Sequence, residues 1–304
     1  MWTINADLGR KIIARAFPGG APQQTRAKSR ADLPASLGRM GSLEVRLAAS
    51  KKDVRKAQRL RYKVFFEGGG AVPGAKAAIT RLDADRFDKF CDHLLVVDHE
   101  ARNRFGKIKP KVVGAYRLLR SDVAKKHGGF YSADEYDVAP LLAHHKGKRI
   151  LELGRSCVLD QYRRKRVIEL LWRGLLAYVR HHRIDAMIGC ASLPGANPLA
   201  HALALSFLAY HARASEEWLV SARSEFYAPM KILAKEAVDP RKALAVLPPL
   251  IKGYLRVGAK FGDGAVADHK FNTTDVFVVL PFADMDARYL EFFGSAAETE
   301  RQAA

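Results

Sequence analysis

The fold is decided by the stretch Leu151-Glu-Leu-Gly-Arg-Ser-Cys-Val-Leu159, with the basic turn Tyr162-Arg-Arg-Lys-Arg166 that follows it. Residues 151–159 alternate as a β-strand does, so that successive side chains point to opposite faces. After the turn, one helix face is predicted at i, i+3, i+4 and i+7 by Val167, Leu170, Leu171, Gly174, Leu175 and Tyr178. This strand–turn–helix unit presents a helix N-terminus, which attracts an anion such as a phosphate.

Further strands and helices are predicted on both sides of this unit. Periodicity predicts strands at 43–47, 93–98, 112–119, 184–191, 218–222 and 276–282, and helices at 51–66, 198–211 and 249–259. Asn197 is well placed to cap the helix at 198–211. The order predicts an α/β (α+β) fold, a mixed and mostly antiparallel sheet with helices on both faces. This order is typical of the N-acetyltransferase-like (GNAT) fold, although the strand pattern alone does not single that fold out.

Composition limits the classes of protein. The 304 residues are 48% hydrophobic, which is enough for a real core. Residues 1–42 are predicted to form a basic, flexible tail, 43–283 the folded domain, and 284–304 a C-terminal helix or tail. Three cysteines without a CxxC pair argue against a disulfide framework and a thiolate zinc site. No apolar run is long enough for a spanning helix, so we expect a cytoplasmic protein, peripheral at most to the inner membrane.

The net charge points to an anionic partner. Fifty-one basic and 32 acidic residues give +19. Nucleic acid, an anionic lipid surface and an acidic carrier protein all match this charge. Nucleic acid is the weakest of the three, because the basic runs lack interleaved surface aromatics.

Four aspartates precede the strand at 93–98: Asp83, Asp85, Asp88 and Asp92. One interpretation is a site for a cationic substrate, in which carboxylates hold an ammonium. The other is helix capping with a solvated acidic surface.

Charged residues also lie inside the predicted core strands, where they are costly unless they are paired or used. Glu152 and Arg155 are predicted to face opposite sides of their strand, so they do not simply neutralise each other. Arg117 on the preceding strand poses the same question. Each of the three is either a site residue or a member of a structural salt bridge.

The basic run Arg163, Arg164, Lys165 and Arg166 opens the helix that starts near Val167. Cations oppose the macrodipole at a helix N-terminus. The run therefore favours an anionic partner there, either a phosphopantetheine phosphate or the acidic surface of a carrier protein. Solvated, screened charge is the alternative.

Other motifs indicate no site. His93 and Asp98 match a His-x4-Asp spacing but lie in a strand on opposite faces, so no dyad is expected. The segment Gly262-Asp-Gly264 lacks the context of a nucleotide loop. We expect no metal site, and we interpret 144–145 and 181–182 as surface histidine pairs.

Several segments together resemble the bacterial L-ornithine Nα-acyltransferases of ornithine lipid biosynthesis. These hemolysin-like proteins belong to the GNAT superfamily and are related to the acyl-homoserine-lactone synthases. The resemblance covers about 43–281 and rests on Arg61-Tyr-Lys-Val-Phe65-Phe, on 85–96, on Phe130-Tyr-Ser, on 152–158, on Gly189-Cys-Ala-Ser192, on 247–254 and on 262–276. It implies transfer of a 3-hydroxyacyl chain from acyl carrier protein to the α-amine of L-ornithine, giving lyso-ornithine lipid, with no bound cofactor.

The lactone-synthase relatives carry Arg-x3-Phe, Asp-x2-Asp, a strand arginine and Glu-x2-Arg. By motif, the resemblance places substrate-binding roles on Arg61, Phe65, Asp85, Asp88, Arg117 and Arg155. The usual glycine-containing pyrophosphate loop is replaced by the basic run at 163–166, which favours a large acidic donor over acetyl-CoA.

The implied reaction is aminolysis of a thioester, for which we assign three catalytic roles. Glu152 is expected to be the general base, acting through one water. Backbone N–H groups around Ser156, Cys157 and Val158 are expected to hold the oxyanion. Ser156 or a nearby tyrosine is expected to protonate the leaving sulfur. The acyl slot is expected between strands, at Leu153, Ile188, Leu203 and Phe207.

Four alternatives stay open. The aspartates at 85 and 88 are structural if they only organise the three arginines. A lactone-synthase activity would require S-adenosylmethionine, and another amino acid could replace ornithine as acceptor. A non-catalytic basic protein that binds membrane is the fourth possibility.

Overall fold

The computed structural model of the chain describes residues 33–163 and 165–291. Most of the expected basic tail, Arg164 and residues 292–304 lie outside the described residues. The described chain forms one eight-stranded sheet with the strand order β1-β2-β3-β4-β5-β6-β8-β7. The strands are β1 (Gly38–Met40), β2 (Leu43–Leu47), β3 (Asp92–Asp98), β4 (Lys111–Arg120), β5 (Ile150–Val158), β6 (Ala186–Pro194), β7 (Lys260–Asp268) and β8 (Thr273–Pro281).

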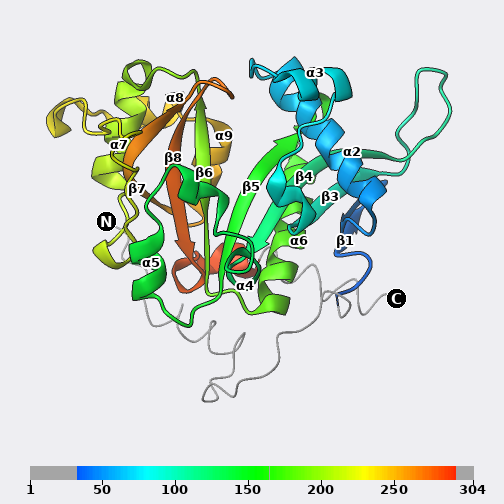
Figure 1. Ribbon diagram of the computed structural model, residues 1–304, viewed down its shortest axis with the longest axis horizontal. Coiled ribbons are helices and arrows are strands. Elements are labelled where there is room, and N and C mark those ends of the chain that lie inside the picture. The colour runs from blue at the N-terminus through cyan, green and yellow to red at the C-terminus, as the bar shows by residue number, and fades with distance from the viewer. Residues whose placement is uncertain (1–32, 164, 292–304) are drawn as a thin grey trace.

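Helices cover both faces of this sheet, which confirms the α/β class (Figure 1). The longer helices are α2 (Lys51–Tyr62, continued by a π-helix at Lys63–Glu67), α6 (Lys165–His182), α7 (Ala202–His211) and α9 (Pro249–Arg256). Shorter ones are α3 (Ala75–Thr80), α4 (Ser121–Ala124), α5 (Ala139–His144) and α8 (Pro240–Val246). In Figure 1, α2 lies in front of the sheet and α6 lies behind it.

Local signals explain where the main helices form. Ser50 caps α2, because its side chain accepts from the Asp53 N–H. The apolar face of α6 packs on the sheet at Gly174, where an added Cβ would lie 2.6 Å from Val45 Cγ2. No helix in the described part of the chain is both long and apolar enough to span a bilayer.

The sheet divides between β5 and β6. These two strands are parallel, and they pair only from Ile150 with Ala186 to Leu153 with Gly189. At the last pair an added Cβ on Gly189 would lie 2.4 Å from the Leu153 carbonyl oxygen, so only glycine allows this approach. Beyond it the strands diverge, β5 staying with β4 and β6 staying with β8 (Figure 1).

Three sequence expectations about the sheet need correction. The expected strand at 218–222 is wrong: a 3₁₀ turn, Glu216–Trp218, is followed only by isolated bridges. Strand β7 was not predicted, because two glycines and a register shift interrupt its alternation. The sheet also begins at β1, ahead of the expected start at Leu43.

Candidate active site

A network of arginines and aspartates lies on the α2 side of the sheet. Arg61 of α2 is 1% exposed and donates to both Asp88 oxygens, at 2.7 and 2.8 Å, and from Nε to Asp83 at 2.8 Å. Arg117 of β4 is also buried and contacts Asp88 at 3.3 Å. Burial opposes ionisation of Asp88, but Arg61 outweighs it and holds the pKa of that carboxyl far below its usual range. These residues form a structural ion network.

The network reaches the surface through Asp85 and Arg155. Their side chains are 22% and 11% exposed, and Arg155 Nη2 lies 3.3 Å from Asp85 Oδ2. Asp85 also accepts from Arg117 Nη1 at 2.6 Å and caps a 3₁₀ turn, Arg86–Lys89. Burial opposes ionisation of Asp85, but Arg117 and Arg155 hold its pKa below the usual value. The two aspartates that the sequence suggested as one site therefore have different positions. Asp88 belongs to the buried structural network, and Asp85 lies at the partly exposed edge of that network.

Arg155 does not face away from Glu152, as the alternation predicted. The register of β4 with β5 shifts between the pairs Arg117–Gly154 and Ala115–Cys157, so β5 contains one extra residue. Arg155 has φ of 53°, the left-handed conformation common in such bulges. The bulge turns Arg155 onto the face of Glu152, where its guanidinium carbon lies 4.8 Å from the Tyr131 ring centre.

Glu152 is sealed in packing. It is 3% exposed, and its two oxygens accept the backbone N–H groups of Tyr131 and Ser132, each at 2.8 Å. Burial raises the pKa of Glu152 in spite of the bonds from Ser132 and Tyr131. The carboxylate thus holds the start of the 3₁₀ turn Tyr131–Asp134. This corrects the expectation that Glu152 faces a substrate cleft.

The segment held by Glu152 carries a carboxylate that the sequence analysis did not select. Glu135 ends the turn and is partly exposed. In the described part of the chain, no hydrogen bond or ion pair is found for its side chain. Burial, with Asp275 of β8 and Asp268 of β7 nearby, raises the pKa of Glu135 to about 7. A carboxylate near neutrality is suited to general base catalysis.

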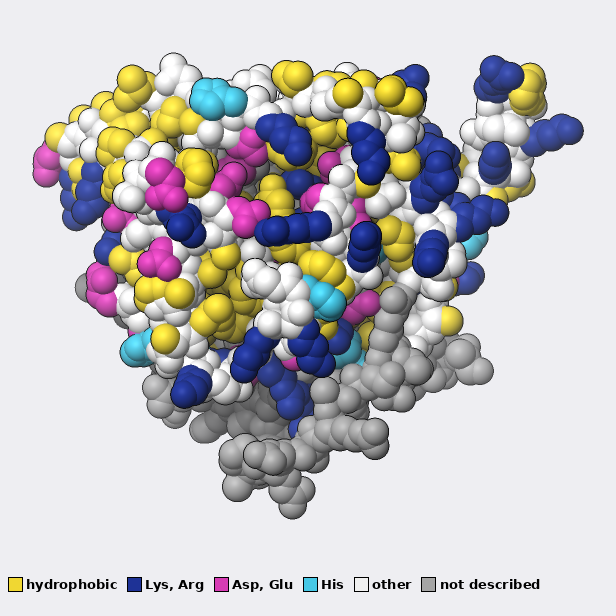
Figure 2. Space-filling model, in the orientation of Figure 1, with side chains coloured by type: hydrophobic (Ala, Val, Ile, Leu, Met, Phe, Trp, Pro, Cys, Tyr) yellow, Lys and Arg dark blue, Asp and Glu magenta, His cyan; other side chains and the backbone are white. Residues whose placement is uncertain are grey.

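Asp275 completes this acidic group. It is buried, its Oδ1 has no hydrogen-bond partner among the described residues, and burial raises its pKa. Asp and Glu side chains gather near the middle of the face in Figure 2, with arginines and lysines beside them. Little in the sequence indicates this group, because Glu135, Asp268 and Asp275 come from separate elements. The one signal is that Phe130-Tyr-Ser and 262–276 belong to the segments that carry the family resemblance.

An apolar cavity lies where β5 and β6 part. It is a narrow pocket that is partly open to solvent. Its lining comes from β5, α6, β6, α9 and β8: Leu153, Trp172, Met187, Ile188, Gly189, Cys190, Tyr254, Val278 and Leu280. Leu153 and Ile188 were expected there, whereas Leu203 and Phe207 of α7 do not line it. Burial, Asp275 and Glu135 raise the pKa of the Cys190 thiol, which lies on the face of β6 that carries the acidic group.

Hydroxyl groups lie at the cavity wall. The Tyr254 hydroxyl is 2.8 Å from that of Tyr116, and Tyr116 in turn interacts with the Ser156 side chain. The Leu159 N–H donates to the Val113 carbonyl of β4. Because N–H groups alternate in direction along a strand, the N–H groups of Val158 and Ser156 point away from β4, to the side from which β6 has diverged. The Cys157 thiol is buried, and burial raises its pKa to about 12, which argues against a nucleophilic role.

The basic turn is exposed, and Phe65 reaches Arg155 only through Phe271. Arg163 is exposed, pairs with Asp160 at 2.8 Å and donates toward the Val158 carbonyl, and Arg166 is exposed as well. Arg164 and the Lys165 side chain lie outside the described residues. Phe65 contacts Phe271 edge-on at 5.9 Å, and Phe271 also lies 4.5 Å from the Arg155 guanidinium carbon.

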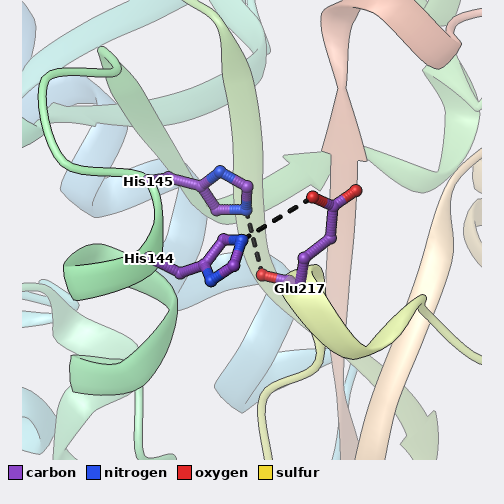
Figure 3. A group of neighbouring side chains, drawn as sticks. All are labelled: His144, His145 and Glu217. Carbon is purple, nitrogen blue, oxygen red and sulfur yellow. Dashed lines mark hydrogen bonds and ion pairs between the residues drawn. The ribbon is translucent and has the colours of Figure 1, made fainter.

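One cluster of possible metal ligands is found among the described residues: His144, His145 and Glu217 (Figure 3). The His145 ring stacks on Trp218 at 3.5 Å, and its Nε2 donates to the Glu217 backbone carbonyl at 2.9 Å. The proton on that nitrogen makes it a poor ligand, so the cluster links α5 to the turn at Glu216–Trp218. The expectation of surface histidine pairs is wrong for His145 and His182, which are buried. His93 and Asp98 form no dyad, as predicted, because they bond to Asp88 and Tyr162 respectively.

Comparison with known proteins gives several matches. A family described as an acetyltransferase (GNAT) domain matches residues 60–173. The L-ornithine N(alpha)-acyltransferase of Rhizobium meliloti is 53% identical over 266 residues, which cover 87% of this chain and 89% of that protein. The protein of the same name from Agrobacterium fabrum is 51% identical, over 90% of this chain and 92% of its own. Among solved structures, the N-acyl amino acid synthase FeeM from uncultured soil microbes is 12% identical, covers 79% of this chain and 90% of its own, and has a TM-score of 0.43.

Proposed function

Since the chain belongs to the L-ornithine Nα-acyltransferase family, its reaction is acyl transfer to the α-amine of L-ornithine, and we propose that the acyl chain is a 3-hydroxyacyl group delivered by acyl carrier protein. The observation that supports a transfer site here is the divergence of β5 and β6. An acidic group with Arg155 lies on one side of this opening and an apolar cavity on the other. Acceptor and acyl chain would therefore meet between the strands.

The chemistry is aminolysis of a thioester. The α-ammonium loses one proton, its nitrogen forms a C–N bond with the acyl carbonyl, and the C–S bond then breaks. The departing pantetheine thiolate takes up a proton, so the products are the amide, which is lyso-ornithine lipid, and the free thiol. We propose that no bound cofactor takes part in these steps.

We assign the first proton transfer to Glu135 in place of Glu152. Glu135 is partly exposed and unpaired within the described chain, and its pKa of about 7 lets it accept a proton near neutrality. Glu152 is then a positioning residue. By capping the turn at Tyr131–Asp134 it fixes both Glu135 and the Tyr131 ring that contacts Arg155.

The charges of ornithine match the remaining groups of this face. Its carboxylate can pair with Arg155, which provides a planar fork of donors at the edge of the ion network. Its δ-ammonium can pair with Asp275, whose Oδ1 has no partner in the described structure, and with Asp268 beside it. Asp85 orients Arg155. The buried residues Arg61, Asp88 and Arg117 in turn hold Asp85 and its 3₁₀ turn in place.

The donor would occupy the opposite side. The cavity lined by Leu153, Trp172 and Tyr254 provides apolar walls for an acyl chain. The N–H groups of Ser156 and Val158 on the open edge of β5 are suited to the oxyanion. The linked hydroxyls of Ser156, Tyr116 and Tyr254 offer a proton to the sulfur.

The basic turn supports a large acidic donor. Arg163 and Arg166 are exposed at the start of α6, directly after the strand that would bind the thioester. We expect the affinity for acyl carrier protein to fall steeply with salt, because exposed charges are screened within about 10 Å at 0.1 M salt. The net charge of +19 also favours peripheral contact with an anionic membrane, where the amphiphilic product belongs.

A product assay tests the proposal. Purified protein is incubated with 3-hydroxyacyl carrier protein and ornithine labelled at the α-nitrogen, and the products are identified by mass spectrometry. The expected product is an amide that contains the labelled nitrogen. A product only from S-adenosylmethionine or another amino acid, a product acylated at the δ-nitrogen, or efficient use of the coenzyme A thioester alone would overturn it.

A further inference from the structure

We propose that the β3–β4 hairpin loop, residues 99–110, is the element that inserts into the surface of an anionic bilayer. This inference rests on the peripheral membrane contact proposed above and names the part of the chain that makes it. The loop projects away from the body of the molecule (Figure 1). Figure 2 shows apolar and basic side chains together on this projection.

Two apolar side chains on the loop are exposed. Phe105 is 71% exposed and Ile108 is 58% exposed. A phenylalanine at the tip of a projecting loop gains nothing from packing within the chain, but it gains free energy when it enters the boundary between headgroups and acyl chains.

Cations surround these two side chains. Arg102, Arg104, Lys107, Lys109 and Lys111 fall within ten residues, and no acidic residue lies among them. The Arg104 guanidinium carbon lies 4.6 Å from the Phe105 ring centre, so the aromatic tip and a cation form one surface. Basic residues beside apolar ones are the pattern that binds anionic lipid.

The loop is built to hold this shape. The Asn103 side chain accepts the N–H groups of Phe105 and Lys107, at 2.9 and 3.1 Å. Arg102 pairs with Ile108 in an isolated bridge and donates to the Gly106 carbonyl at 2.7 Å. Gly106 has φ of 73°, which favours glycine at the turn. The tip is therefore presented with little ordering left to occur on binding.

A bilayer explains the loop better than an acidic protein does. An acidic carrier protein requires only positive charge on the surface that it contacts. Arg163 and Arg166 already provide that charge near the proposed thioester site. Only a partner with an apolar interior accounts for exposed Phe105 and Ile108 between the cations.

Vesicle sedimentation tests the proposal with the full chain. Vesicles of phosphatidylglycerol and phosphatidylcholine are compared with vesicles of phosphatidylcholine alone, using the wild-type protein, the double variant Phe105→Ser/Ile108→Ser and the triple variant Arg104→Gln/Lys107→Gln/Lys109→Gln. Val246→Ser is the matched control, because Val246 is exposed on α8 at the other end of the molecule (Figure 1).

We expect binding to the anionic vesicles only, a loss of tenfold or more in both loop variants, and no change in Val246→Ser. All variants should acylate ornithine at the wild-type rate from a donor in solution, which separates a failure of this inference from a failure of the proposed reaction. Unchanged vesicle binding in the double variant would overturn the proposal. So would a loss of carrier-protein binding in that variant with vesicle binding intact, which would make the loop a carrier-docking element.

Discussion

Glu152 and Arg155 reach the same residue, Tyr131, from the same face of β5. Glu152 accepts the Tyr131 backbone N–H at 2.8 Å, and the Arg155 Nη1 lies 3.4 Å from the Tyr131 hydroxyl. Strict alternation would separate positions three apart, and the bulge at Arg155 brings them together. The buried carboxylate of Glu152 therefore fixes the segment whose Tyr131 contacts the largely buried Arg155.

Glu152→Gln should lower stability. The amide keeps one oxygen acceptor but brings an NH₂ group against a backbone N–H, so one main-chain donor loses its partner. We expect the free energy of unfolding to fall by about 1–3 kcal/mol, measured by urea denaturation. Turnover should fall only in part, through displacement of the turn that carries Glu135. Complete loss of turnover at wild-type stability would instead restore Glu152 as the base.

Arg117 and Arg155 should respond differently to replacement by Met, although both contact Asp85. Arg117→Met removes the bonds at 2.6 Å to Asp85, while Arg61 still pairs with Asp88, so we expect a loss of about 1.5–3 kcal/mol in the free energy of unfolding. Arg155→Met should cost little stability, because Arg61 and Arg117 still neutralise the aspartates.

Arg155→Met should instead raise KM for ornithine by roughly 10- to 100-fold, the range for a hydrogen bond to a charged group. Arg155→Lys should not restore it fully, because an ammonium lacks the planar fork. An unchanged KM for ornithine in Arg155→Met would remove this residue from acceptor binding.

Gly189→Ala tests the divergence of β5 and β6. The new Cβ would meet the Leu153 carbonyl oxygen at 2.4 Å, so the last pair of the two strands has to open. We expect a loss of about 1–3 kcal/mol in thermal unfolding. Gly253→Ala in α9 is the control; no atom lies within 4 Å of its added Cβ, so it should be neutral or gain about 0.5–1 kcal/mol. Equal effects of the two substitutions would contradict the close approach at Gly189.

Val278→Phe tests the acyl cavity, because Val278 lines it on the same sheet face as Leu153 and Met187. The larger side chain fills space at the cavity wall, so the ratio of kcat/KM for long over short acyl donors should fall roughly tenfold or more. Leu203→Phe is the matched control, because Leu203 was expected in the slot from the sequence but does not line the cavity. A change in the preferred acyl-chain length of the donor in the Leu203 variant alone would place the acyl slot at α7.

Much of the fold was predictable from sequence, because its long elements repeat their apolar residues regularly. Strand β5 lies within one residue of the predicted range, and helix α6 contains the whole predicted face at 167–178 and extends beyond it at both ends. The bulge at Arg155 was missed, although Gly154 directly before it is an isolated glycine within a strand, which is a signal for a bulge. The left-handed φ falls on Arg155 itself, where the sequence gives no sign of it.

The candidate site was predictable only in part, for the same reason. The ion network follows from motif residues, and the sequence left its structural role open as an alternative. Glu135 follows a single 3₁₀ turn without periodicity, and its pKa is raised by burial and by Asp275 and Asp268, more than 130 residues away in the chain. This acidic group can be identified only in the folded structure, where the strands bring its members together.

The most direct measurement of the central claim is the pH dependence of ornithine acylation in the wild type and in Glu135→Gln. Glu135 must be ionised to accept a proton, so wild-type kcat/KM should fall about tenfold for each pH unit below about 7 and level off above it. Glu135→Gln should lose about 10²–10⁴-fold in rate, and its rate should no longer fall with pH below 7 as the wild-type rate does. It should unfold no more easily than the wild type, because the raised pKa means that ionisation of Glu135 destabilises the fold as pH rises toward 7. A Glu135→Gln enzyme with the wild-type rate and the same acidic limb would contradict the account.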